Sequence, residues 1–468
     1  MTIVIVSILL LGCLLIATEN ITKVNRAAVA IFAGTAGWVL YICFGLDFVT
    51  SQHACDFSSY LHSQTPAIPG SSVTVKNFIS RFIFLPYVGK AAEIVLFLLA
   101  TMTIVEILNN NGCFDFIRQL LRTRSSKRMI WTLSVVTFLV SANLDNLTTT
   151  VMMLTIMHGI IPSRRQRMFY GSAILLSANC GGAFTVIGNP EGLVLWNSGA
   201  VTATCYSMSL LLPCLAAWLV PVYLISRRLP ERVDTEWIVM PYRGDDTRLN
   251  VWQRLLMLFV GIGGLWFIPT FHNISKLSPF LGALCVLSVL WIVNEIFNRK
   301  LMNMDAMVDR RTPRVLQYGV IQMILFVMGI MLAVGVVKET GAYDELMECL
   351  GIDENHPFVW LHGVAAGMVS TVLDNFATAI NFFSFPTVMG QAGLTTSELS
   401  TVYGCNGLYW RVIAFCVMAG GNVLGIGTMS GLALMKMEHM HVGWFFRHVG
   451  WKALSGGVVG LALLWLAQ

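Results

Sequence analysis

The sequence predicts an all-α polytopic membrane protein with about ten spans and two re-entrant hairpins, arranged as two inverted repeats with broken helices. Three observations support this prediction. Of the 468 residues, 56% are hydrophobic and only 12% are charged, whereas soluble domains carry about 25% charged residues. The apolar runs continue for about 18–25 residues, as spanning helices require, and lack the alternation of a β-barrel strand. A polar Leu-Asp-Asn motif lies inside two of the apolar stretches.

Eight apolar runs predict simple spans, since each is close to the length needed to cross a bilayer. The first run has no basic residue before it, and Lys23 and Arg26 follow it. A cleaved signal peptide has the opposite charge order, so we expect a retained span with its N-terminus outside. The predicted spans are 3–18, 26–46, 83–108, 205–226, 251–269, 277–297, 317–337 and 450–467.

The basic residues predict the orientation. Lys and Arg concentrate in four connections, 109–128, 162–167, 227–250 and 298–316, which we expect to be cytoplasmic because positive loops stay inside. The acidic connection 339–356 contains no Lys or Arg after Glu339, and 387–399 carries only Glu398; both are expected outside. No basic patch interleaved with aromatic residues is present, so the expected partners are membrane lipid and small cations rather than nucleic acid.

Two stretches, 129–162 and 355–386, predict re-entrant hairpins. The first has basic loops at both ends and only about 14 residues before its polar motif, a climb of roughly 21 Å against a hydrocarbon core of roughly 30 Å. It is therefore expected to enter from the cytoplasm, turn at 143–148 and return. The second has non-basic connections at both ends, and is expected to enter from outside and turn at 373–375.

A repeat relates the two hairpins. Asp145 and Asp374 are 229 residues apart, and the pair Gly112 and Gly341 has the same offset. Downstream, GGAFTVIGNPEG (181–192) resembles GGNVLGIGTMSG (420–431), and the density of Gly and Pro predicts a broken helix in each half. Because the span before one hairpin runs inward and the span before the other runs outward, the repeats are expected to be inverted. The predicted parts are a first repeat (1–226, with broken helix 168–197), a cytoplasmic linker (227–250) and a second repeat (251–468, with broken helix 400–436).

The hairpin tips and helix breaks predict an ion site. Unwound carbonyls, amides, hydroxyls and carboxylates are hard oxygen ligands, which suit Na⁺ or Li⁺. A charged carboxylate at mid-membrane costs at least about 3 kcal/mol, so it tends to take up a proton when no cation is present, and Na⁺ and H⁺ then compete for it. This is the chemistry of an antiporter with no catalytic residue, no cofactor and no metal beyond Na⁺. The predicted ion-binding residues are Asp145, Asn146, Thr148, Asn179, Asn189, Glu191, Asp374, Asn375, Thr378 and Asn422.

Each of these motifs has a structural alternative. Asp and Asn are common N-caps, and a hairpin tip needs a cap in any case. A glycine-rich stretch also forms a packing face against a neighbouring helix. Glu93 and Glu106 flank one span and are candidates for a proton path or a pH response, or they reach the interface as snorkelling side chains. The histidines have no metal-ligand spacing.

The motifs ANLDNLTTTVMMLTI, ATMTIVEIL, SANCGGA and VLDN resemble those of the NhaD-type Na⁺/H⁺ antiporter family of the ion transporter superfamily. The resemblance implies exchange of Na⁺ or Li⁺ for H⁺ favoured at alkaline pH, a role in pH homeostasis, and a bacterial inner membrane. It also implies a homodimer in which a transport domain moves against a scaffold. The matching site residues are Asp145, Asn146, Asn179, Asp374, Asn375 and Glu106.

One motif departs from that family. After Ile-Gly the family tends to have Asp followed by threonines, whereas this chain has GNPEG at 188–192, which is closer to the loops of anion-transporting relatives. The alternative function is therefore a Na⁺-coupled or uncoupled permease for a carboxylate or an arsenite-like oxyanion. Walker A, GxSxG, HExxH and Rossmann motifs are absent from the sequence, so an enzyme subunit or a sensor is disfavoured.

Overall fold

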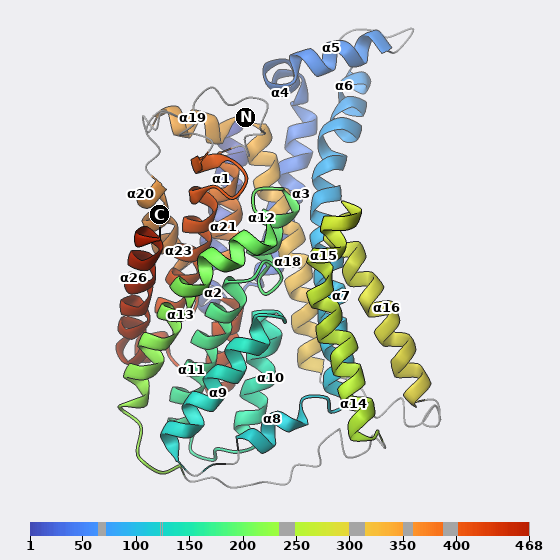
Figure 1. The fold of residues 1–468 in the computed structure, drawn as a ribbon. Helices are drawn as coiled ribbons and strands as arrows, with labels where there is room; N and C mark the ends of the chain where they lie inside the picture. The colour runs from blue at the N-terminus through green and yellow to red at the C-terminus, as the bar shows by residue number, and fades with distance from the viewer. Residues whose placement is uncertain are drawn as a thin grey trace. The chain divides into compact units, whose positions relative to one another are not determined.

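The computed structural model describes residues 1–63, 72–121, 123, 125–233, 249–298, 314–349, 359–386 and 401–467. In this part of the chain the regular elements are helices, together with one isolated bridge between Ser125 and Arg232 (Figure 1). Eight helical stretches are long and apolar enough to cross a membrane, and Thr2–Ala17 and Val359–Ser370 are shorter apolar helices. The prediction of an all-α polytopic membrane protein is confirmed.

The eight spanning stretches are α3 (Arg26–Cys43), α6 with η1 and α7 (Ser72–Phe78, Ile79–Phe84, Leu85–Asn110), α13 (Ala203–Ser226), α14 with η2 and α15 (Val251–Leu258, Phe259–Gly263, Gly264–Ser275), α16 (Pro279–Asn298), α18 (Arg314–Glu339), α23 with α24 (Leu408–Leu424, Met429–Glu438), and α25 with η4 and α26 (Val442–Phe445, Phe446–Gly450, Trp451–Leu466). Seven of them coincide with predicted spans, and the other, α23 with α24, coincides with the predicted broken helix 400–436. The predicted span 3–18 forms α1 (Thr2–Ala17), one of the shorter apolar helices. Short helices are α2 (Glu19–Thr22), α4 (Gly45–Gln52), α5 (Ala54–Ser63), α8 (Asp115–Leu120) and α19 (Ala342–Cys349).

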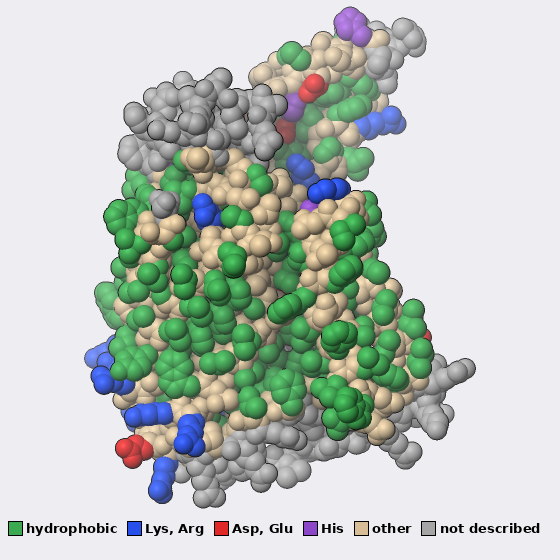
Figure 2. Space-filling view, in the orientation of Figure 1, with side chains coloured by type: hydrophobic (Ala, Val, Ile, Leu, Met, Phe, Trp, Pro, Cys, Tyr) green, Lys and Arg blue, Asp and Glu red, His purple; other side chains and the backbone are tan. Residues whose placement is uncertain are grey.

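The surface has the character that lipid requires. Figure 2 shows apolar side chains over the middle of the face that it draws, with Lys and Arg near its lower margin and several more in its upper part. Large apolar side chains such as Trp252 and Phe259 are 82% and 73% exposed. Exposure to water costs about 25 cal/mol per Å² of apolar surface, so side chains of this size on a helix indicate contact with acyl chains.

The chain forms two compact units. Unit 1 comprises Met1–Val95, Gly319–Phe358 and Ile380–Thr387, and unit 2 comprises the rest of the chain. In unit 1, α3 packs closely on α18: Trp38 Nε1 donates a hydrogen bond to Leu332 O at 3.0 Å. Both predicted repeats contribute residues to each unit, so the units are not the repeats. The repeat boundaries stay a prediction, and most of the predicted linker 227–250 lies outside the described residues.

Unit 2 is built around two largely buried helices, α11 (Arg164–Ala183) and α23. The helix α11 packs on α9 (Ser126–Ser141), α10 (Asn146–His158) and α13, and α23 packs on α20 (Val359–Ser370) and α26. Figure 1 shows α9 and α10 in the lower part of this unit and α20 at its upper left. Two long buried helices therefore form the frame on which the hairpins lie.

Helices are interrupted in all four stretches where the sequence predicts a hairpin or a broken helix. Gaps separate α9 from α10, α11 from α12 (Pro190–Asn197), α20 from α21 (Asn375–Ser384), and α23 from α24. The predicted turns 143–148 and 373–375 are too long at their C-terminal ends. Asn146 and Asn375 already belong to the following helices, because the preceding aspartates accept backbone hydrogen bonds and allow the helix to start at once.

Glycines allow equivalent close contacts in the two halves. A Cβ on Gly181 would collide with the Phe138 carbonyl, and a Cβ on Gly420 would collide with the Gly367 carbonyl. Phe138 and Gly367 keep the 229-residue offset, and the two glycines keep an offset of 239. Part of the glycine-rich pattern therefore serves packing, as the structural alternative predicted.

We expect Gly181→Ala and Gly420→Ala each to lower the free energy of unfolding by about 1–3 kcal/mol, because the new methyl group pushes the frame helix away from the backbone of the hairpin helix that it contacts. Gly89 in α7 is a matched control, since nothing lies within 4 Å of an added Cβ; Gly89→Ala should raise stability by about 0.5–1 kcal/mol. Thermal unfolding of the detergent-purified protein measures both. Equal effects at all three positions would contradict the close contacts.

Candidate functional site

The first hairpin tip is organised by Asp145, the N-cap of α10. Its Oδ2 accepts hydrogen bonds from Thr148 N at 3.0 Å and from Thr148 Oγ1 at 3.3 Å. The residue is 5% exposed, and its Oδ1 has no hydrogen-bond partner in the described structure. The predicted capping role is thus real, but it uses one carboxylate oxygen and leaves the other available.

The second tip is built in a related way. Asp374 Oδ1 accepts a hydrogen bond from Phe376 N at 3.0 Å. Asn375 N donates to the Gly427 carbonyl at 2.8 Å, so this tip is joined directly to the break between α23 and α24. Ser370 Oγ lies 2.7 Å from Asn375 Oδ1, which orients the amide. Both Asp374 and Asn375 are 5% exposed, and Thr378, one turn further on, is fully buried.

Buried amides connect the first tip to the second broken helix. Asn179, in the middle of the frame, accepts a hydrogen bond from Asn146 Nδ2 at 3.3 Å. Its own Nδ2 donates to Asn422 Oδ1 at 2.7 Å and lies 3.5 Å from Thr428 Oγ1. Thr428 caps α24, accepting from Gly431 N at 3.0 Å. Residues from both halves therefore form one continuous polar network.

Glu191 adds a third carboxylate to this region. It lies in the first turn of α12, after Asn189 and Pro190, and is 8% exposed. It is within electrostatic range of both Asp145 and Asp374. No group of three or more His, Cys, Asp or Glu among the described residues is placed to hold a metal ion, so the three carboxylates are neighbours without converging on one point.

Several buried oxygen atoms around these breaks have no hydrogen-bond partner in the described structure. They are Asp145 Oδ1, Thr149 Oγ1, Asn189 Oδ1, Glu191 Oε2, Thr378 Oγ1 and Ser430 Oγ. Burying a polar atom without a partner costs about 1–3 kcal/mol, so a group of such atoms indicates a place for an ion or water. Thr149 corresponds to Thr378 by the 229-residue offset, and Glu191 corresponds to Ser430 by the 239-residue offset.

Thr149 was not among the predicted site residues, whereas Thr428 and Ser430 belong to the GGNVLGIGTMSG motif that the sequence pairs with GGAFTVIGNPEG. The repeat offsets contained the signal, since Thr149 aligns with the predicted Thr378, and Thr428 and Ser430 align with Asn189 and Glu191. The predicted residues Glu93 and Glu106 lie on α7, both half-buried, and belong to different compact units. Their suggested role in a proton path or pH response remains a prediction.

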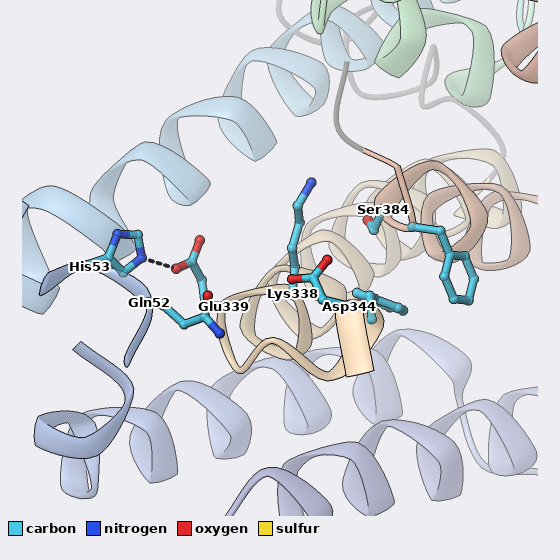
Figure 3. Close-up of a pocket in the computed structure, with 8 residues that line it drawn as sticks. Gln52, His53, Lys338, Glu339, Asp344 and Ser384 are labelled. Atoms are coloured by element: carbon cyan, nitrogen blue, oxygen red, sulfur yellow. Dashed lines mark hydrogen bonds and ion pairs between the residues drawn. The ribbon is translucent and has the colours of Figure 1, made fainter. Parts of the chain in front are cut away.

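Unit 1 contains a separate polar cavity of about 170 Å³. His53 Nε2 lies 2.7 Å from Glu339 Oε2, and Tyr87 donates to the other oxygen of Glu339 at 2.7 Å. Figure 3 shows His53 and Glu339 facing each other, with Lys338 and Asp344 nearby. The sequence analysis did not identify this cluster, because His53 and Glu339 are 286 residues apart and form no local motif.

Tyr343 lies at the edge of the same cavity and binds Asn381. Burial raises the pKa of the Tyr343 hydroxyl above its ordinary value, so the group stays protonated and donates to Asn381 Oδ1 at 2.8 Å. This hydrogen bond joins α19 to α21 within unit 1.

The apolar spanning helices, the broken helices and the buried polar network define a membrane transporter. The family model described as citrate transporter (CitMHS) matches residues 1–402, and the chain belongs to this family. Its relatives also confirm the predicted NhaD-type antiporter resemblance.

Two relatives come from Arabidopsis thaliana. The chain is 32% identical over 379 residues to sodium/proton antiporter 1, covering 80% of this chain and 62% of that protein. It is 29% identical over 378 residues to sodium/proton antiporter 2, covering 80% and 84%. A bacterial relative is the Na⁺/H⁺ antiporter NhaD of Vibrio cholerae, 25% identical over 397 residues, covering 80% and 77%.

Serine side chains tie both hairpins to the frame at equivalent places, which gives a test. Ser141 Oγ donates to the Ala178 carbonyl at 2.7 Å. Ser370 Oγ lies 2.9 Å from the Val417 carbonyl, which shares the one hydroxyl proton with Asn375 Oδ1. Ser134, on the same helix as Ser141, is fully buried with no hydrogen-bond partner.

We expect Ser141→Ala and Ser370→Ala each to cost about 1 kcal/mol of unfolding free energy through the lost hydrogen bond. Ser134→Ala should be neutral or stabilising, because it removes an unpaired hydroxyl. Thermal unfolding in detergent distinguishes them. A loss at Ser134 as large as that at Ser141 would show that these hydrogen bonds do not hold the hairpin.

Proposed function

We propose that this protein is a Na⁺/H⁺ antiporter that also accepts Li⁺, and that it works by alternating access around the hairpin tips. The observation that carries the proposal is the placement of two buried carboxylates, Asp145 and Asp374, within electrostatic range of a third, Glu191. The relatives that bear the name sodium/proton antiporter support the same ions.

The competition between ions follows from electrostatics. Three neighbouring carboxylates inside a membrane cannot all stay charged cheaply, because burial and mutual repulsion both disfavour the charged forms. A bound proton or a bound Na⁺ relieves this repulsion. When Na⁺ enters and its carboxylate ligands must be charged, protons leave; when protons return, the affinity for Na⁺ falls. Exchange of the two ions thus needs no further chemical step.

Oxygen atoms suited to Na⁺ surround the carboxylates. Unpartnered oxygens of Asp145, Thr149 and Asn189 lie at or next to breaks in the first half, and those of Thr378 and Ser430 lie at the equivalent places in the second half. Sodium prefers such hard oxygen ligands. Two related sets of ligands, one from each half, suit a transporter whose site lies at mid-membrane between inverted repeats.

Glu191 is proposed to replace the carboxylate that the related antiporters tend to have two positions earlier. At that earlier position this chain has the neutral residue Asn189, which stands at the N-cap position of α12 without a side-chain capping hydrogen bond. Glu191 lies in the first turn of the same helix, where the helix dipole favours a negative charge. On this proposal the GNPEG motif keeps an acidic residue at the site but places it two positions later in the sequence than in the related antiporters.

The orientation and assembly are part of the same proposal. The distribution of basic loops supports a multi-pass protein with the N-terminus on the periplasmic side, and the bacterial NhaD relative supports a bacterial inner membrane. A homodimer fits the idea that a mobile transport domain needs a fixed scaffold. The partners would then be membrane lipid, small cations and a second copy of the chain.

One observation favours a carboxylate permease as a second candidate. The helices α10, α12, α21 and α24 all begin at the breaks, and helix N-termini attract anions. The family description, citrate transporter, points the same way. Against this, the three carboxylates carry the same sign of charge as citrate and lie in the same region, so an anion would meet repulsion unless they were all neutralised.

We expect Asp145→Asn and Asp374→Asn each to reduce Na⁺-dependent proton exchange in everted membrane vesicles to background across pH 6–9.5, because each removes a carboxylate that binds Na⁺ or H⁺. Glu295→Asn is a matched control. Glu295 binds Trp291 on the surface of α16, away from the network, and its loss should leave exchange intact. Fluorescence dequenching with Na⁺, Li⁺ and K⁺ is the measurement, and normal exchange in both aspartate variants would refute the site.

We expect no accumulation of radiolabelled citrate or succinate by vesicles under an imposed Na⁺ gradient, because of the charge repulsion described above. The positive control is Na⁺-dependent dequenching in the same preparation. Na⁺-driven citrate uptake that is lost in Asp374→Asn would instead decide for the permease.

A further inference from the structure

A buried carboxylate outside the proposed ion site links the two halves of unit 2. The side chain of Glu438, the last residue of α24, is 0% exposed. His158 Nε2 lies 2.6 Å from its Oε1, and Arg167 Nε lies 3.1 Å from its Oε2. A buried carboxylate that lost these partners would carry an uncompensated charge, which is strongly destabilising.

Arginines of α11 also hold the end of α24. Arg164 donates from Nε to the Glu438 carbonyl at 3.0 Å and from Nη2 to the His439 carbonyl at 2.7 Å. Cations at a helix C-terminus stabilise its unpaired carbonyls. We call His158, Arg164, Arg167 and Glu438 the Glu438 cluster. Its cations come from the first half, and its carboxylate comes from the second.

The Glu438 cluster and the proposed ion site lie at opposite ends of the same helices. The helix α10 runs from its cap at Asp145 to His158, and α24 runs from its cap at Thr428 to Glu438. These helices have 13 and 10 residues, or about 20 and 15 Å of length. A contact that fixes their far ends therefore fixes how the first tip lies against Thr428.

The contact to His158 depends on charge. The side chain of His158 is 33% exposed, and its Nε2 atom is buried. Its Nε2 is at ion-pair distance from Glu438 without the orientation of a hydrogen bond, so the attraction requires the imidazolium. Histidine changes charge near neutral pH, whereas Arg164 and Arg167 stay charged throughout and keep Glu438 paired when His158 is neutral.

We propose that Glu438 is a positioning residue for transport, and that the ion pair by which it holds α10 is sensitive to pH because His158 must be protonated to form it. This rests on the proposed antiporter function. At acid pH two cations clamp Glu438, and α10 is fastened to α24. At alkaline pH only the arginines of α11 remain; α10 still packs on α24 but is no longer bound to Glu438, and the first tip moves more readily relative to the second half. Acid pH thereby slows turnover.

Variants of His158 test the direction of the effect. In everted vesicles, His158→Gln, which is always neutral, should move the half-maximal activation of Na⁺/H⁺ exchange toward acid pH. His158→Lys, which stays charged, should move it toward alkaline pH and lower the rate at pH 8. The control His62→Gln changes an exposed histidine in unit 1 and should leave the profile unchanged. Profiles of both His158 variants that coincide with wild type would overturn the proposal.

A second measurement separates the cluster from the transport function. The Tm of purified wild type should exceed that of His158→Gln, and this difference should be about 2–4 °C larger at pH 6 than at pH 9. The reason is that the His158 side chain stabilises the folded state through Glu438 only when it is protonated. If wild type exchanges no ions at any pH, the antiporter proposal fails while this difference still supports the clamp. A difference that does not change with pH refutes the clamp, whatever the transport result.

Discussion

The structure depends on the requirement that backbone groups exposed by a helix break be satisfied without water. In a bilayer an unpaired N–H or C=O group costs several kcal/mol. This protein breaks four helices in unit 2 and fills each break with side-chain and backbone hydrogen bonds. Asp145 accepts from Thr148, Thr428 accepts from Gly431, and Asn375 donates to Gly427. The same polar groups that make the breaks tolerable also form the candidate site, so capping and ion binding are not competing explanations.

The two halves achieve this with corresponding contacts but different chemistry. The serine that ties each hairpin to the frame, and the glycine that lets the frame helix approach it, recur at constant offsets. At the breaks the residues diverge: Glu191 corresponds to Ser430, and Asn189 corresponds to Thr428. Similar backbone packing with unequal side chains is suited to a site in which one half supplies more negative charge than the other.

Much of the candidate site could be predicted from sequence because its residues stand out chemically. A carboxylate or an amide inside an apolar stretch is costly, so Asp145, Asn179 and Asp374 were evident without coordinates. The buried hydroxyl of Thr149 was not, because Ser and Thr are common in spanning helices, where they bond to the preceding turn. The ionic contacts of His158 and His53 were also missed. Their partners are 280 and 286 residues away, and no local pattern connects such positions.

The sequence by itself determined that the chain spans a membrane with helices, where those helices break, and which polar residues lie at the breaks. These properties follow from composition and local spacing, since hydropathy and helix-breaking residues act within a turn or two. Only the tertiary structure decided that Glu191 lies within range of both aspartates, that Asn179 bridges the halves, and that Glu438 is enclosed by cations of the other half. Those relations arise from packing between segments that are distant in sequence. The partner of a buried charge can be identified only when the positions of the two helices that carry the pair are known.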